Sequence, residues 1–262
     1  MSERDYKLSA RGVRVIGAPP SLLSGERTSS DGKPVSNHIL LAIPDNEFQL
    51  IRPFLHSVDL PPHVSLHEPG ETIEFAYFLN RGLISVVVAT REGKTVEVGV
   101  VGKEGIVGTP AIFGLKLSPH RAVMQISGDA FQVPVDFLLS SLGSLMQLQL
   151  LACRHAMVQG MQAAQSAACN RLHGIEQRLA RWLLLVQDRV DNGLLKITHD
   201  FLATMLGTDR PSVSLAAGEL QRKGTIGYSR GEVRIENRKK LEELACECYS
   251  VMQQFNGSLG LR

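Results

Sequence analysis

The stretch Thr198–Gly224, THDFLATMLGTDRPSVSLAAGELQRKG, predicts two short helices separated by a tight turn. Apolar residues recur at helical spacing in its first half, and Gly207 tolerates positive φ where the first helix must end. Asp209 is placed to cap a second helix, and Pro211 lies in that helix's first turn, where a missing N–H costs nothing. The second helix, expected over Arg210–Lys223, leaves arginine and serine outward, which suits insertion into a DNA major groove. For this stretch alone, a helical hairpin in an ordinary core is the alternative.

A β-hairpin is predicted immediately downstream, over Thr225–Ile235 (TIGYSRGEVRI). Its apolar residues alternate with polar ones around Arg230-Gly231, where the glycine permits a turn. Two helices followed by a hairpin form a winged helix-turn-helix, in which the wing lies over the phosphate backbone. Between Lys196 and Lys240, nine Lys/Arg stand against five Asp/Glu, a local charge of +4 in a chain whose total is +2. Binding to a polyanion such as DNA would use this concentration of positive charge.

Length and composition exclude several classes of protein. A chain of 262 residues suggests two domains, and an apolar content of 44% supports real cores. No apolar run reaches the roughly 18 residues that span a bilayer, and the first residues, MSERDYKLSARG, hold no apolar signal region, so we expect a cytoplasmic protein. The chain has no Walker-type loop, no GxSxG elbow and no HExxH motif, so we do not expect an enzyme.

Changes in composition and in hydrophobic periodicity along the chain mark the predicted domains. Residues 1–37 are rich in Ser, Gly, Pro and Arg without periodicity, which predicts a disordered extension. Short β-branched and aromatic runs separated by glycines between residues 64 and 134 predict an antiparallel sandwich, barrel or roll, with Gly82 at the corner of one hairpin. The predicted divisions are an extension over 1–37, a β-roll over 38–142, a long helix over 143–173, a winged helix-turn-helix over 174–250 and a tail over 251–262.

The long helix carries a coiled-coil seam. Seven residues follow an unbroken 4,3 spacing, and they become small toward the C-terminal end, which would let two helices approach closely. An amphipathic helix packed on its own domain is the alternative. Because a two-fold dimer would place two recognition helices about one DNA turn apart, we expect a homodimer. The seam residues are Met146, Leu150, Cys153, Met157, Gly160, Ala164 and Ala167.

None of the four cysteines lies in CxxC spacing. Cys153 and Cys169 lie within helical pattern, and redox control through either of them stays open. Cys246 and Cys248 would point to different faces if their segment were helical, so we expect no shared metal ion. The favoured interpretation is that the four cysteines are buried or unreactive thiols without a functional role.

The order of roll, long helix and winged helix-turn-helix resembles the Crp–Fnr family of bacterial transcription regulators over roughly residues 38–250. The segments that carry the resemblance are VVGKEGIVGTPAIFG (Val100–Gly114), SPHRAVMQISGDAFQVP (Ser118–Pro134), CNRLHGIEQRLARWLL and ITHDFLATMLGTDRPSVSLAAGELQRKGTI. The resemblance implies an α+β fold with a cyclic-nucleotide-binding-like antiparallel β-roll, and homodimers in which a signal reorients the DNA-binding domains. It also implies double-stranded DNA as a partner, and RNA polymerase if the protein is an activator. Because no cysteine precedes Cys153, the N-terminal iron–sulfur centre of the family's oxygen-sensing branch is excluded.

The effector pocket departs from the pattern of cyclic-AMP binders. Those members carry Gly-Glu before an Arg-Ser or Arg-Thr pair, in which Glu binds the ribose and Arg the cyclic phosphate. Here Gly108 is followed by Thr109, and His120-Arg121 replaces the pair. These four are the candidate pocket residues. We expect an effector other than cyclic AMP, or none, and assign no cofactor or metal. A cyclic-nucleotide-responsive regulator is the alternative.

The recognition helix departs as well, because Pro211 and Leu215 stand where better-known members carry a base-reading Glu and Arg. Arg210 can bind guanine O6 and N7. We therefore predict a sequence-specific DNA-binding regulator with an unfamiliar half-site. A protein-interaction module that uses the roll as a scaffold, without DNA, is the alternative from another class. The predicted DNA contacts are Thr198, Asp209, Arg210, Ser212, Ser214, Lys223, Ser229 and Arg230.

Overall fold

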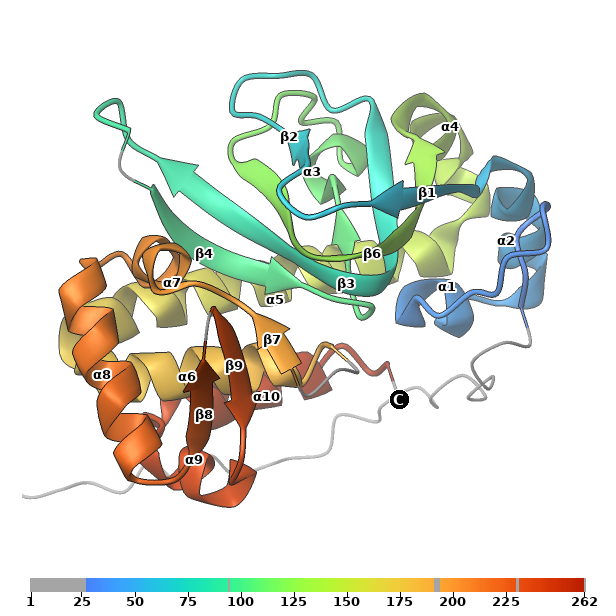
Figure 1. Ribbon diagram of the computed structural model, residues 1–262. Helices are drawn as coiled ribbons and strands as arrows, with labels where there is room; N and C mark the ends of the chain where they lie inside the picture. Colours follow the sequence, from blue (N-terminus) through green and yellow to red (C-terminus); the bar gives the residue numbers. More distant parts are fainter. Residues whose placement is uncertain (1–26, 94, 191–193, 230, 262) are drawn as a thin grey trace, which may run out of the picture.

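The computed structural model describes residues 27–93, 95–190, 194–229 and 231–261. A β-roll occupies the upper part of Figure 1, the helix-turn-helix half lies below it, and the long helix α5 runs between them. The N-terminal half comprises α1 (His38–Ala42), α2 (Asp45–Ile51), the 3-10 turn η1 (Arg52–Phe54), β1 (His56–Leu60), β2 (Ser65–His67), β3 (Phe75–Ala89), β4 (Thr95–Val101), β5 (Ile106–Val107), α3 (Thr109–Ile112), β6 (Arg121–Pro134), α4 (Val135–Ser141) and the 3-10 turn η2 (Leu142–Ser144). The C-terminal half comprises α5 (Met146–Leu172), α6 (Ile175–Gln187), β7 (Leu194–Lys196), α7 (His199–Leu206), α8 (Arg210–Arg222), β8 (Ile226–Ser229), β9 (Glu232–Ile235), α9 (Arg238–Leu244) and α10 (Cys248–Gly257).

The roll is one antiparallel sheet in the order β1-β6-β3-β4, with β2 paired to β6 and β5 to β3. The predicted corner at Gly82 is wrong, because β3 passes through this residue as a single strand of 15 residues. Gly82 instead adopts φ 93° where the β3–β6 register shifts. A Cβ there would overlap the carbonyl oxygen of Ile126, and one on Gly128 would overlap that of Arg81. The two glycines therefore let the strands bend together as the sheet curls.

The predicted extension is folded where the structure describes it, from residue 27 onward. The Arg27 guanidinium is buried and donates to the carbonyl oxygens of Leu40 and Ile43 at 2.7 and 2.9 Å. Asn37 caps α1 through its side-chain oxygen and donates to Gly105 O at 2.9 Å. The assignment of residues 27–37 to a disordered extension is therefore corrected, since long-range hydrogen bonds order a segment whose composition is typical of disorder. Residues 1–26 lie outside the described part.

The C-terminal half is organised around α6, whose Trp182 side chain is buried. Strands β7, β9 and β8 form a second antiparallel sheet. The tail predicted from residue 251 is also corrected, because that boundary falls inside α10. Met252 and Leu259 are both buried, and Gln162 of α5 donates to Asn256 at 2.6 Å. The last described residues thus pack on the long helix as part of the fold.

Among the described residues, no single helix is both long and apolar enough to cross a membrane. Within the same residues, one pair of helical segments, Val135–Ser144 and Met146–Leu172, is long and apolar enough when the two are taken together, but the pair is bent by 118°.

The roll and the helix-turn-helix half share one core, in which Leu83, Val87 and Val100 pack with apolar residues of α6, α7 and α8. Two polar contacts cross the same boundary. Trp182 donates to the Glu97 carboxylate at 2.8 Å, and Arg189 pairs with Glu104 at 2.7 Å. Both carboxylates belong to the roll, so the helix-turn-helix half packs against β4 and the loop after it.

The pKa values of these two carboxylates are shifted in opposite directions. Burial raises the pKa of Glu97 to about 7, although Ser85 and Trp182 donate hydrogen bonds to this carboxylate. Burial is also the largest single influence on Glu104 and acts in the same direction, but the charge and hydrogen bond of Arg189 together with a backbone hydrogen bond outweigh it, and the pKa of Glu104 is lowered. Glu97 therefore exchanges a proton near neutral pH, whereas Glu104 stays ionised.

Candidate nucleic-acid interface and effector cavity

Local capping builds the helix-turn-helix as the sequence predicts. The Thr198 hydroxyl accepts from the Phe201 N–H at the start of α7, and Gly207 ends that helix in the left-handed region at φ 60°. The Asp209 carboxylate accepts from the Ser212 N–H at 2.8 Å and begins α8, with Pro211 in the first turn. These caps satisfy N–H groups that have no partner inside the helix, and they fix the angle between α7 and α8.

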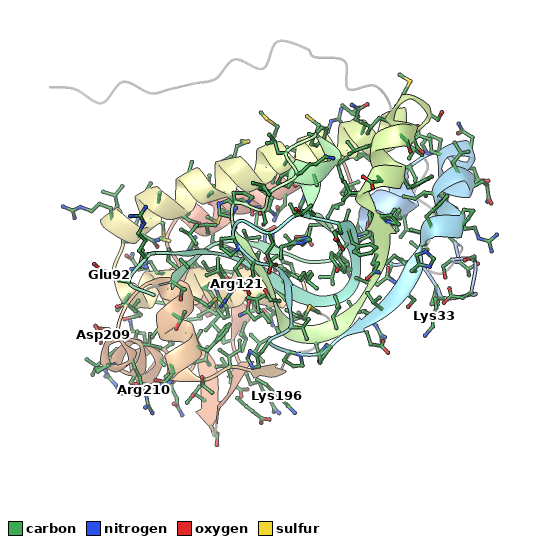
Figure 2. The ribbon with its side chains drawn as sticks, turned by 90° about the horizontal axis from the view of Figure 1, so that it is seen from above. Lys33, Glu92, Arg121, Lys196, Asp209 and Arg210 are labelled. Carbon is green, nitrogen blue, oxygen red and sulfur yellow. The ribbon has the colours of Figure 1, made fainter. Side chains whose placement is uncertain are left out.

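The outer face of α8 is open to solvent. Val213, Ala216, Ala217 and Leu220 of this helix are buried. On the opposite face, the Arg210 side chain is 65% exposed, with one nitrogen 3.6 Å from Asp200. Leu215 is 74% exposed in the middle of the same face, an unusual position for a large apolar side chain. Figure 2 shows Asp209 and Arg210 at the outer end of this half, and Lys196 further along the same side.

Several predicted DNA contacts also have partners inside the domain. Ser212 Oγ donates to Asp209 at 2.9 Å, Ser214 Oγ lies 2.9 Å from His199 Nδ1, and Lys223 pairs with Glu176 of α6 at 2.5 Å. Asp209 and Thr198 serve as caps. Ser229 is exposed at the end of β8, whereas Arg230 lies outside the described residues. Among these residues, Arg210 is therefore the cation best placed to extend toward a ligand.

A cavity of about 310 Å³ lies inside the roll and is closed on one side by α5. Its wall contains three of the four predicted pocket residues, Gly108, Thr109 and His120. Arg121 does not line it. The Arg121 guanidinium instead donates to Glu68 at 2.9 Å on the surface. The remaining wall is mainly apolar, and no arginine among the described residues lines the cavity to pair with a cyclic phosphate.

Two histidines that the sequence analysis did not assign to the pocket also line this cavity. Burial lowers the pKa of His67, and it lowers that of His155 to about 4, so both rings are neutral at pH 7. His67 Nε2 and His155 Nδ1 have no hydrogen-bond partner among the described residues. The sequence held one indication that His155 faces the interior. In the helical pattern of α5, His155 falls on the same face as the apolar residues Leu151 and Val158.

All seven predicted seam residues are exposed on α5. Among the seam residues, Met146 and Met157 are large apolar side chains that are 69% and 65% exposed. The opposite face of the helix packs on the roll and on α10. The helix therefore has apolar residues on two faces, of which only one is covered in a single chain.

Two family models match the chain. A cyclic nucleotide-binding domain matches residues 57–142, and a Crp-like helix-turn-helix domain matches residues 177–244. The first covers the strands of the roll but not the α5 wall of the cavity, and the second covers the region from α6 to α9. The chain belongs to the Crp–Fnr family.

The similar proteins agree with this assignment to the Crp–Fnr family. The transcriptional regulator SdrP of Thermus thermophilus is 26% identical over 178 residues, which are 65% of this chain and 83% of SdrP. The structure of FixK2 from Bradyrhizobium japonicum has a TM-score of 0.64 at 16% identity and covers 73% of this chain and 98% of that one. The c-di-GMP-responsive regulator CLP of Xanthomonas campestris has a TM-score of 0.62 at 15% identity, with 73% and 99% covered. At these identities the two structures show the shared fold. The Crp–Fnr family is one of transcription regulators rather than enzymes.

Proposed function

We propose that this Crp–Fnr regulator binds DNA sequence-specifically as a homodimer, with α8 in the major groove. The single observation that carries the proposal is the open outer face of α8, which presents Arg210 in its first turn above a capped, packed scaffold. Arg210 would bind guanine O6 and N7. The exposed Leu215 would contact a thymine methyl group, a role the sequence comparison did not suggest for it.

The exposed seam of α5 supports the homodimer. A second copy packed on this face would cover Met146, Leu150 and Met157, and the small residues beyond them would allow close approach of the two helices. Two copies of α8 would then face the DNA together.

The chemistry of the roll cavity supports a small, mainly apolar effector. A cyclic nucleotide carries a phosphate charge, which needs a cation or several N–H donors once it is out of water. The cavity instead offers apolar walls and neutral imidazoles, while Arg121 is held by Glu68. Calorimetric titration with cyclic AMP, cyclic GMP and cyclic di-GMP is expected to show no heat of binding. Saturable heat from any of them would overturn this part of the proposal.

The DNA-binding proposal is tested by selecting sites from random duplexes and measuring their affinity by fluorescence anisotropy. Arg210→Ala is expected to lose about 10- to 100-fold for the selected site, because one bidentate guanine contact is worth about 1–3 kcal/mol. Arg222→Ala is the matched control, since this arginine lies at the other end of α8 and pairs with Glu219. If the Arg210→Ala protein keeps both the wild-type affinity for the selected site and the wild-type sequence preference, the Arg210 side chain does not contact a base. If the wild type fails to bind DNA even at low salt, the interaction-module alternative is favoured.

The homodimer is tested by sedimentation velocity. Met157→Lys would place a charge in the middle of the seam and is expected to yield monomers at micromolar concentration, where the wild type is dimeric. Leu117→Lys is the control, because Leu117 is 61% exposed but belongs to the roll and not to the seam. A Met157→Lys protein that sediments as the wild type does would place the interface elsewhere.

A further inference from the structure

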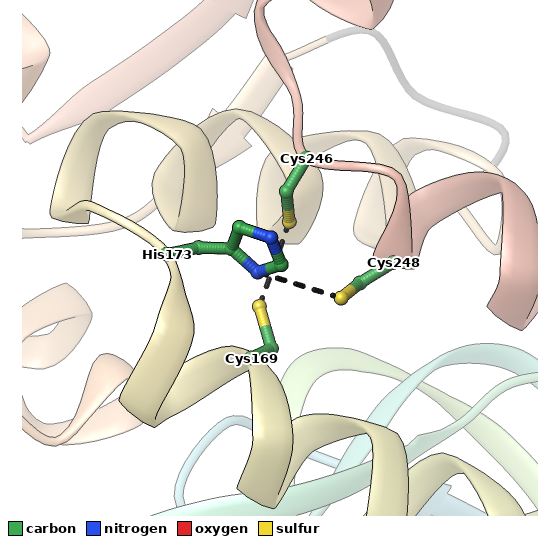
Figure 3. Close-up of side chains that lie close together, drawn as sticks. All are labelled: Cys169, His173, Cys246 and Cys248. Atoms are coloured by element: carbon green, nitrogen blue, oxygen red, sulfur yellow. Dashed lines mark hydrogen bonds between the residues drawn. The ribbon is translucent and has the colours of Figure 1, made fainter. Parts of the chain in front are cut away.

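Four side chains that can ligate metal ions meet at the C-terminal end of α5 (Figure 3). Cys169 lies in the last turn of that helix, and His173 follows its end. Cys246 lies in the link between α9 and α10, and Cys248 is the first residue of α10. The three sulfurs and one imidazole nitrogen all lie within 4.8 Å of one another.

The short distances are those of a tetrahedral site. Cys169 Sγ lies 3.5 Å from Cys246 Sγ, and Cys248 Sγ lies 3.6 Å from His173 Nδ1. A Zn²⁺ ion with bond lengths of about 2.3 Å to sulfur and 2.0–2.1 Å to nitrogen spaces its ligands by about 3.8 Å (S···S) and 3.6 Å (S···N). The four ligand atoms are therefore close enough together to bind one ion. An iron–sulfur cluster would hold its thiolates further apart.

The backbone explains why the two cysteines of Cys246-Glu247-Cys248 converge, contrary to the expectation from sequence. The segment is not a continuous helix, because Ala245 is extended after α9 and α10 begins only at Cys248. The Tyr249 N–H donates to Cys246 O at 3.0 Å and closes a turn. That turn brings both thiols to the same side. The sequence analysis rejected a shared ion on the assumption of one helix, which does not hold.

Further contacts orient the ligands as outer partners do in metal sites. His173 Nε2 lies 3.1 Å from the Glu247 carboxylate, which leaves Nδ1 directed at Cys248. Gln165 donates to Cys248 Sγ at 3.0 Å. A carboxylate on the far nitrogen of a ligating histidine fixes its tautomer and ring orientation. The three thiols are buried and the His173 side chain is 14% exposed, so the cluster is closed, as structural sites are.

Two buried arginines supply an independent observation. Arg178 and Arg181 of α6 are 8% and 5% exposed, and their Nε atoms have no hydrogen-bond partner among the described residues. Arg178 donates to the Leu206 carbonyl oxygen and Arg181 to the Met252 sulfur, so neither guanidinium has a charged hydrogen-bond partner among the described residues. A buried cation needs a compensating negative charge. Three thiolates around one divalent ion carry a net charge of −1, which offsets one of the two guanidinium charges.

We propose that Cys169, His173, Cys246 and Cys248 bind one Zn²⁺ ion, which fastens the end of the long helix to the DNA-binding half. Binding releases the protons of the three thiols, and the ion takes up three thiolate sulfurs and one imidazole nitrogen. The chain between α5 and α6 passes directly beside this site. Occupancy therefore restricts the hinge through which α5 is joined to the DNA-binding half.

The test uses the full chain purified after growth with Zn²⁺. Elemental analysis is expected to find one zinc per chain, and replacement by Co²⁺ to give the visible bands of a tetrahedral site together with thiolate charge transfer. Cys246→Ser and His173→Gln are expected to lose the metal. Cys153→Ser is expected to keep it, because this cysteine is exposed on the seam.

In the zinc-loaded wild type, a thiol reagent is expected to modify Cys153 alone, and all four cysteines after chelation. This last measurement needs no variant to fold.

Three outcomes would overturn the proposal. The first is wild-type protein that takes up no Zn²⁺ or Co²⁺ on reconstitution under reducing conditions. The second is a loss of two hydrogens in the intact mass, which would show a Cys169–Cys246 disulfide. The third is iron together with acid-labile sulfide in place of zinc. Each is read independently of DNA binding.

Discussion

The DNA-binding half is attached to the rest of the chain on two sides, and the two attachments use different chemistry. On the roll side, Glu97 and Glu104 accept from Trp182 and Arg189 of the α6 region in a buried, mainly apolar contact. On the far side, the end of α5 meets the α9–α10 link through sulfur and imidazole. On the roll side, a proton can neutralise the Glu97 carboxylate, and Arg189 already balances the charge of Glu104. On the far side, the proposed contact is complete only when a zinc ion is bound. One attachment should therefore respond to pH, and the other to zinc and to oxidants.

The largest expected effect is on the roll side. Arg189→Ala would leave the Glu104 carboxylate buried without its cation, and removing one partner of a buried pair costs about 3–5 kcal/mol in the free energy of unfolding. Urea unfolding of the zinc-loaded protein measures this loss. Arg121→Ala is the control, because its pair with Glu68 is solvent-exposed and is worth at most about 1 kcal/mol. If the two variants lose the same stability, the roll-side attachment is not held by its buried ion pair.

A smaller effect is expected from protonation of Glu97. Its pKa is about 7 in the folded chain, against an ordinary 4.5. Between these values the folded state holds a proton that the unfolded state has released, so stability falls as pH rises through this window. The loss from pH 5 to pH 8 is on the order of 2 kcal/mol. Glu97→Gln mimics the neutral carboxyl and should be less pH-dependent and more stable than wild type at pH 8.

Thermal unfolding at pH 5, 6, 7 and 8 measures the Glu97 effect. Glu243→Gln, an exposed position on α9, is the control and should keep the wild-type pH dependence. An unchanged slope in Glu97→Gln would mean that this carboxylate does not set the pH response.

The smallest effect is expected on the zinc side, at a residue that does not touch the ion. Glu247→Gln would weaken the hydrogen bond that orients His173 and should lower zinc affinity about 10-fold, the lower end of what such outer partners contribute. Competition with a chromophoric chelator measures the change, again with Glu243→Gln as the control. Equal affinities in the two variants would show that Glu247 does not orient the ligand.

The features that could be predicted are those fixed by neighbours in sequence. The caps Thr198 and Asp209 and the turn at Gly207 depend on hydrogen bonds within a few residues, so their residue types suffice to place α7 and α8. The fold of the roll followed from its spacing of strands and from the family resemblance. The course of β3 through Gly82 did not, because a glycine at a bulge and a glycine at a hairpin corner look alike in sequence.

The features that could not be predicted depend on residues far apart in the chain. Cys169 meets Cys246 across 77 positions, and no local spacing announces it. His67 and His155 reach one cavity from a strand and a helix. Arg27 is ordered by partners on α1 and beyond, although its surroundings in sequence are typical of disorder. Long-range packing overrode local composition at each of these places.

Gly160 belongs both to the wall of the roll cavity and to the exposed seam of α5. If two copies pair through that seam, each cavity is separated from the partner by the thickness of one helix at a position without a side chain. Effector binding and association then become linked equilibria: whatever factor an effector adds to the association constant, association adds to effector affinity. Saturation curves should consequently shift with protein concentration.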